Sequence, residues 1–258
     1  MKILIACLVV AVGGTVGCRS GGSSADATPA SFTVGAFGVT ISAGAMRLGH
    51  QAGVDLGDVV RNAVKKIEAS LAARGPADIT VGVGLGIPEI GVTGFTNPSS
   101  GAVVVNIQES SPIGLRASMT RWVPQALAHE LFESKRILEG PGFGGTLGAW
   151  LVADGGADNF AHALDPSVGV FPWDKRLTAA QERAMWAKVR PLLSTPLPLS
   201  DFGKWFFGSP DVPRNTGYTI GYHVVGSYLA QHPGIRPADV ATTPAATVLD
   251  TSGYSPPG

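Results

Sequence analysis

Cysteine is scarce in this chain, which has only Cys7 and Cys18 among its 258 residues. Cys7 lies inside an apolar N-terminal stretch that has the features of a cleavable export signal, so the mature chain would keep Cys18 alone. A single cysteine excludes an intramolecular disulfide. Because Cys18 stands at the expected start of the mature chain, it is also a poor candidate for a catalytic thiol.

Charge is sparse and balanced as well. Only 15% of the residues are charged, the formal net charge is zero, and Lys and Arg are scattered along the chain. Proteins that bind nucleic acid concentrate positive charge on one face, so we expect no nucleic-acid partner. The chain also has no Gly-x-Ser-x-Gly elbow and no glycine-rich loop with P-loop spacing. These absences argue against a nucleophilic hydrolase and against phosphate binding of the P-loop type.

Long apolar runs are confined to the N-terminus. There Lys2 precedes the apolar residues Ile3 to Val12, a run too short to cross a bilayer, and small residues follow. The sequence Thr15-Val16-Gly17-Cys18 resembles the lipobox of bacterial lipoproteins. This resemblance implies cleavage before Cys18 and attachment of lipid to that cysteine. An ordinary secretory signal, cut nearby, is the alternative.

These features divide the chain into three parts. We predict a lipoprotein signal peptide over residues 1–17, a flexible tether over residues 18–31 and a single folded domain over residues 32–258. The protein is then expected to be an exported lipoprotein of the cell envelope, held to a membrane through lipid at Cys18.

The spacing of apolar residues predicts an α+β domain. Strands are expected over residues 32–41, 79–84 and 102–107, with a turn at Gly91-Val92-Thr93-Gly94, and helices over residues 56–71, 124–138, 147–164, 178–193 and 218–230. The strand at residues 102–107 has two interpretations. It is either an edge strand that pairs with an extended peptide substrate or an ordinary interior strand.

The clearest chemistry lies in Ala128-His129-Glu130-Leu131-Phe132-Glu133. In the His-Glu-x-x-His motif, a helix places two imidazoles one turn apart to bind zinc, and the intervening Glu acts as general base. Here the carboxylate of Glu133 replaces the second imidazole. A second acidic segment, Asp154-Gly155-Gly156-Ala157-Asp158, follows on the next predicted helix. Together the two segments trace a zinc site with exchanged ligands.

Four segments in this order make the chain similar to a bacterial family of predicted zinc-dependent proteases, otherwise classed as a domain of unknown function. They are residues 128–131, 140–147, 151–158 and 217–222, and the resemblance runs from about Asp78 to Tyr254. The family usually has His-Glu-x-x-His in the first segment and Glu-Gly-x-Ala-Asp in the third. Glu133 therefore stands at the place of a ligand His, and Asp154 at the place of a ligand Glu. The resemblance implies a zincin-like metalloprotease fold, with a small mixed sheet over an active-site helix and a helical C-terminal lobe.

The resemblance also implies a role for each residue. His129, Glu133 and Asp154 would hold a zinc ion, and the carboxylate of Asp158 would accept a hydrogen bond from the other ring nitrogen of His129 and so fix the orientation of the ring. Glu130 would be the general base in the hydrolysis of a peptide or protein substrate. For the oxyanion, Tyr222 is the candidate donor, although a packed core aromatic is equally compatible with this position.

The exchanged ligands leave two functions open. Two carboxylates and one imidazole cancel the charge of a divalent ion, which weakens its pull on water and shifts metal preference toward manganese or calcium. One interpretation is a slower metal-dependent peptidase. The other is a degenerate zincin, weak or inactive in catalysis, that binds a peptide or glycan at the cell surface.

Overall fold

The computed structural model describes residues 27–73, 75 and 77–256. The predicted signal peptide at residues 1–17, the predicted lipid site Cys18 and most of the predicted tether lie outside these residues. In the described part of the chain, none of the helices combines the length and the apolar character that spanning a bilayer requires.

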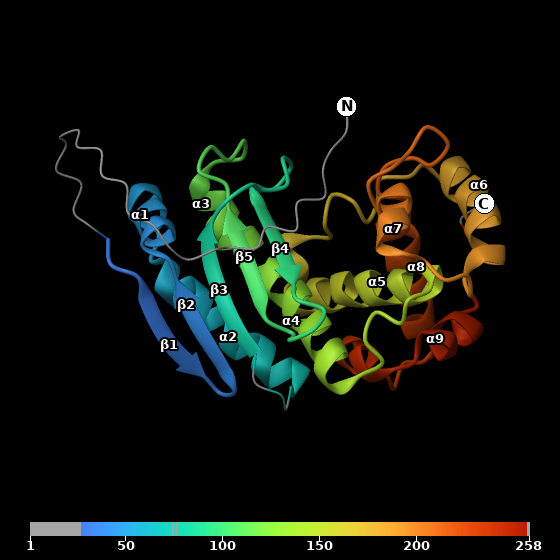
Figure 1. The fold of residues 1–258 in the computed structure, drawn as a ribbon, viewed down its shortest axis with the longest axis horizontal. Coiled ribbons are helices and arrows are strands. Elements are labelled where there is room, and N and C mark those ends of the chain that lie inside the picture. The colour runs from blue at the N-terminus through green and yellow to red at the C-terminus, as the bar shows by residue number, and fades with distance from the viewer. Residues whose placement is uncertain (1–26, 74, 76, 257–258) are drawn as a thin grey trace.

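The fold is α+β, with a sheet at one end of the molecule and a helical lobe at the other (Figure 1). The five strands stand in the order β1-β2-β3-β5-β4. β3 is parallel to β2 and β5, whereas β1 and β4 are antiparallel to their neighbours. The small mixed sheet expected from the sequence is therefore present. The strand bounds are β1 (Ala30–Val34), β2 (Phe37–Ile41), β3 (Ala77–Val83), β4 (Val92–Thr96) and β5 (Val103–Ile107).

The single strand predicted over residues 32–41 is a hairpin. β1 and β2 pair as far as Val34 and Phe37, on either side of a turn at Gly35 and Ala36. Gly35 has a φ of +52°, a left-handed backbone conformation that favours glycine at this turn. The sequence did carry a signal, because the apolar positions shift from even to odd numbers at this point.

The prediction for the segment around Gly91 was also wrong, because residues 92–96 form β4 rather than a turn. β4 is the edge strand beside β5, so β5 has the interior position, which was one of its two interpretations. Gly94 in the middle of β4 weakens the strand signal, since glycine is depleted in strands.

Helices cover one face of the sheet (Figure 1). The main hydrophobic core lies between the sheet and these helices. α1 (Ala43–Ala52), α2 (Leu56–Leu71) and α4 (Val123–Glu139) pack on this side. α2 has the predicted bounds, and the residues of its apolar stripe, such as Val60, Val64 and Ile67, are buried. A three-residue α3 (Leu115–Ala117) and a π-helical turn (Ser118–Trp122) lead directly into α4.

The C-terminal lobe has a second hydrophobic cluster, which includes Leu151, Phe206 and Ile220. Its helices are α5 (Leu147–Leu164), α6 (Ala179–Val189), α7 (Leu199–Phe206), α8 (Thr216–Gln231) and α9 (Ala245–Thr251). α5 has its predicted bounds, and α6 and α8 differ from prediction only at their ends. α1, α7 and α9 were not predicted, because helices of 10, 8 and 7 residues contain too few turns to show a period.

Candidate metal centre

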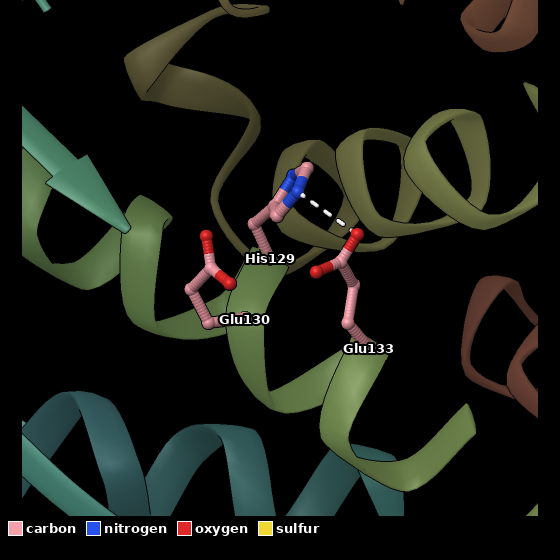
Figure 2. A group of neighbouring side chains, drawn as sticks. All are labelled: His129, Glu130 and Glu133. Atoms are coloured by element: carbon pink, nitrogen blue, oxygen red, sulfur yellow. Dashed lines mark ion pairs between the residues drawn. The ribbon is translucent and has the colours of Figure 1, made fainter. Parts of the chain in front are cut away.

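α4 supplies three of the predicted site residues from two consecutive turns. Pro124 suits the first turn of this helix, where a missing N–H costs nothing, and His129, Glu130 and Glu133 follow. Figure 2 shows the side chains of His129 and Glu133 next to one another, with Glu130 turned to the other side of His129. One ligand atom from each of the three residues lies within 4.8 Å of the others.

The geometry of His129 and Glu133 suits a shared metal ion. The Nδ1 atom of His129 is 2.7 Å from Oδ1 of Asp158, whereas its Nε2 atom is 3.6 Å from Oε1 of Glu133. Two ligands of one tetrahedral zinc lie roughly 3.4 Å apart, because each metal–ligand bond is about 2.1 Å long. The 3.6 Å between Nε2 of His129 and Oε1 of Glu133 is close to this value. Asp158 is hydrogen-bonded to Nδ1, the ring nitrogen that a metal on Nε2 would leave free.

Asp154 is placed less favourably than expected. It lies on α5 and is only 5% exposed, and its Oδ2 atom has no hydrogen-bond partner among the described residues. However, Asp154 does not belong to the group of three whose ligand atoms lie within 4.8 Å of one another. A carboxylate with a buried, unpartnered oxygen suits a cation, and its strongest charged neighbours are Glu133 and His129. The group of His129, Glu130 and Glu133 therefore fits a metal ion, and Asp154 lies outside this group.

Two glycines of α5 allow close packing against its neighbours, Gly155 against α8 and Gly156 against α4. A Cβ on Gly155 would lie 2.1 Å from the carbonyl oxygen of Gly221 on α8, and a Cβ on Gly156 would lie 2.7 Å from the ring of Phe132 on α4. Any larger residue at either position would push the helices apart. Gly156 thus lets α5, which carries Asp154 and Asp158, pack closely against the helix that carries His129.

Burial and crowding of like charges shift the titration of the site. Burial alone would lower the pKa of His129, but the carboxylates of Asp158 and Glu133 outweigh it and raise that pKa well above its usual range. Burial, together with the Glu133 charge, raises the pKa of Glu130 to about 8. The same two causes raise the pKa of Asp154 well above its ordinary value. Without a cation, Glu130 therefore tends to hold a proton near neutral pH, and ionisation of Asp154 is disfavoured.

The edge strand β4 holds Glu130 in place. Thr96 at the end of β4 donates its hydroxyl to the Glu130 side chain, with 2.6 Å between Oγ1 and Oε2, and it also lies 2.9 Å from the Glu130 carbonyl oxygen. A Cβ on Gly94 would lie 2.2 Å from Oε1 of Glu130. The glycine that weakens the strand signal thus makes room for the Glu130 carboxyl group. Neither contact could be read from the sequence, because they join residues more than thirty positions apart.

Asp158 is completely buried and accepts two hydrogen bonds. One comes from His129, and the other comes from the indole Nε1 of Trp173, at 2.9 Å from Oδ2. The Trp173 ring also stacks on Phe171, whose ring meets the edge of His129 at a centroid distance of 6.0 Å. Trp173 belongs to no sequence motif, so sequence reasoning did not find this hydrogen bond.

The two tyrosines of α8 differ in their surroundings. Burial raises the pKa of Tyr222 to about 12, with contributions from the charges of Asp174 and Asp158. Burial also raises the pKa of Tyr218 well above its usual range, and here Asp154, Asp158, Glu133 and Glu130 all contribute. The charges that raise the pKa of Tyr218 thus include all four carboxylates of the site, whereas those that act on Tyr222 are Asp174 and Asp158. The neighbouring His223 instead pairs with Glu182 of α6.

The comparisons with known proteins agree with this site. The family model described as "Predicted Zn-dependent protease (DUF2268)" matches residues 89–250, which include α4, α5 and α8. The match covers well over half of the chain, and the chain belongs to this family. No curated protein and no solved structure matches the chain. Membership and the His129, Glu130 and Glu133 group support zinc as the metal of this fold.

Proposed function

We propose that this protein is a zinc-dependent peptidase in which His129, Glu133 and Asp154 hold the ion. The observation that carries the proposal is the placement of Glu130, which Thr96 holds between the edge strand β4 and the His129–Glu133 pair. When bound, zinc polarises the scissile carbonyl group and lowers the pKa of water.

Glu130 then acts as the proton carrier. It would accept a proton from the attacking water and deliver it to the leaving amine. A group transfers protons in both directions most readily when its pKa lies near the working pH. In the metal-free site the pKa of Glu130 is raised to about 8. The charge of a bound divalent ion would lower this pKa, so Glu130 would then be ionised and able to accept a proton near neutral pH.

Two further groups would bind the substrate. β5 is the one strand neighbour of β4 in the described part of the sheet, so an extended peptide could pair with the outer edge of β4 and pass Glu130. For the oxyanion of the tetrahedral intermediate we favour Tyr218 over Tyr222, because Tyr218 lies in the field of the four site carboxylates.

The first prediction concerns the metal. Purified protein should contain about one zinc per chain, and His129→Ala should abolish binding, because the remaining ligands are carboxylates that zinc prefers less than imidazole. Elemental analysis and thermal unfolding with and without zinc measure this. His50→Ala is the control, since His50 is an exposed histidine on α1, outside the site. Less than about a tenth of an equivalent, with no rise in unfolding temperature on adding zinc, would favour the degenerate zincin that only binds its ligand.

We also propose that the protein is an envelope lipoprotein, supported by the lipobox-like Thr15-Val16-Gly17-Cys18 and the scarcity of other cysteines. Cys18→Ala should move the protein from the membrane to the soluble fraction, because lipid attachment needs the thiol. Fractionation and labelling with a fatty acid measure this. A variant that stays with the membrane, together with a native protein that takes up no label, would contradict the anchor.

A further inference from the structure

A cavity lies in the C-terminal lobe, apart from the metal centre. Its volume is about 990 Å³, and its walls come mainly from α6, residues 190–194, α9 and residues 252–256. Figure 1 shows α6 and α9 toward the end of the molecule opposite the sheet. None of the proposed metal ligands lines this cavity. Pockets that bind small molecules have volumes of about 300–1,000 Å³, so this cavity is large enough for a small ligand.

Two aromatic rings form one corner of the cavity. Trp186 of α6 and Tyr254 are both partly exposed and line it. Their rings meet edge to face, with 4.9 Å between the centroids and 83° between the planes. The two rings therefore present apolar surfaces at nearly a right angle to each other.

Buried polar groups hold this corner in place. The Tyr254 hydroxyl donates to Oε1 of Glu182, a residue that is only 2% exposed. Nδ1 of His223 on α8 lies 2.5 Å from the same oxygen. The hydroxyl of Ser227, also on α8, donates to the carbonyl oxygen of Ser252 at 2.8 Å and so fixes the segment before Tyr254. The aromatic corner is thus formed before a ligand binds, which reduces the entropy lost on binding.

Polar groups of both charges surround the aromatic corner. Arg190, which follows α6, and Asp250 of α9 line the cavity and are exposed, as is Ser194. No ion pair between described residues includes Arg190 or Asp250. The cavity therefore offers a guanidinium donor, a carboxylate acceptor and a hydroxyl group beside an apolar surface.

We propose that this cavity binds a pyranose ring of a short oligosaccharide. One face of a pyranose carries C–H groups that pack on an aromatic ring, and each of its hydroxyl groups both donates and accepts hydrogen bonds. The guanidinium of Arg190 only donates and the carboxylate of Asp250 accepts, so neighbouring hydroxyl groups of one sugar satisfy both. An extended peptide fits less well, because it pairs through main-chain groups and α6 and α9 use most of theirs internally.

Isothermal titration calorimetry on the full protein tests the site, with maltotriose, chitotriose and trigalacturonate as the probes. At least one of these sugars should bind. Trp186→Ala should weaken that binding by about tenfold, because it removes the apolar surface under the sugar. Arg190→Gln and Asp250→Asn should each weaken it by about three- to tenfold through lost hydrogen bonds. Removing zinc with a chelator should leave sugar binding unchanged, so the test stands whether or not the protein cleaves peptides.

Phe207→Ala and Arg214→Gln are the matched controls. Phe207 is a 54% exposed aromatic residue and Arg214 is an exposed arginine, and neither lines the cavity although both belong to the same lobe. Neither change should alter sugar binding. If Trp186→Ala does not fold, the variants of Arg190 and Asp250 still test the site, because both side chains are exposed.

Three results would overturn the proposal. The first is that none of the three sugars binds. The second is that a sugar binds and the cavity variants weaken it no more than the controls do, which would place the sugar elsewhere. The third is that a pool of short peptides, rather than the sugars, binds in a way that the cavity variants weaken.

Discussion

Glu130→Gln is expected to lower peptide hydrolysis by about 10²- to 10⁴-fold, the usual contribution of a general acid–base group. Glutamine has nearly the same shape and can still accept the Thr96 hydroxyl, so the contact with β4 is kept. It cannot take a proton from water. Zinc content and unfolding temperature should therefore stay close to those of the native protein while the turnover number falls.

The control for this variant is Glu109→Gln, which removes a carboxylate whose side chain is 67% exposed. We expect this variant to have the turnover number of the native protein. A casein-type protein serves as the substrate for all variants. If Glu130→Gln cleaves at the native rate with zinc bound, the proton carrier is another residue and the proposed mechanism is wrong.

The pair of ligand helices was the part of the site that could be predicted. His129 and Glu133 are four residues apart, and any α-helix brings such residues to one face. The resemblance to the family predicted Asp158 beside His129, and Oδ1 of Asp158 lies 2.7 Å from Nδ1 of His129 in the structure. Both placements follow from helix geometry and from the four matching sequence segments, so they could be predicted without the tertiary fold.

Contacts that come from distant segments could not be predicted. Thr96 reaches Glu130 from the edge strand β4. Trp173 reaches Asp158 from the segment between α5 and α6, where the hydroxyl of Thr219 donates to the Trp173 carbonyl oxygen. The sequence also did not show which face of α8 meets the site. Buried residues occur all around this helix, so its period does not show whether Tyr218 or Tyr222 points to the carboxylates.

The charge of the site suggests that the proposed ligand set would suit zinc less well than the usual set with two imidazoles. Glu130 and Asp154 each have a raised pKa, and the Glu133 charge contributes to both shifts. Binding of a divalent ion must displace the protons that these acids hold. An imidazole at position 133 would remove one negative charge from the cluster and supply a ligand that zinc prefers.

The second large effect is therefore expected from Glu133→His combined with Asp154→Glu. The longer glutamate should bring its carboxylate closer to the group of three that Asp154 does not join. Zinc affinity should rise roughly tenfold or more, because imidazole suits zinc better than a carboxylate does. With less negative charge around the ion, the pKa of water on zinc should fall toward about 7, and hydrolysis at neutral pH should increase. Zinc titration and turnover of the casein-type substrate measure the two effects separately.

Each single variant shows which replacement limits the site. Asp154→Glu alone tests whether a longer side chain at position 154 improves zinc binding. Glu133→His alone tests the effect of removing a negative charge and supplying an imidazole ligand. Adding Glu130→Gln to the double variant should remove the gain in hydrolysis but keep the gain in zinc affinity, since Glu130 is proposed to carry protons rather than to hold the ion. A double variant that binds zinc tightly yet cleaves nothing in a broad peptide library would mean that the site has lost more than its ligands. In that case, peptide or glycan binding at the cell surface becomes the better account of the natural protein.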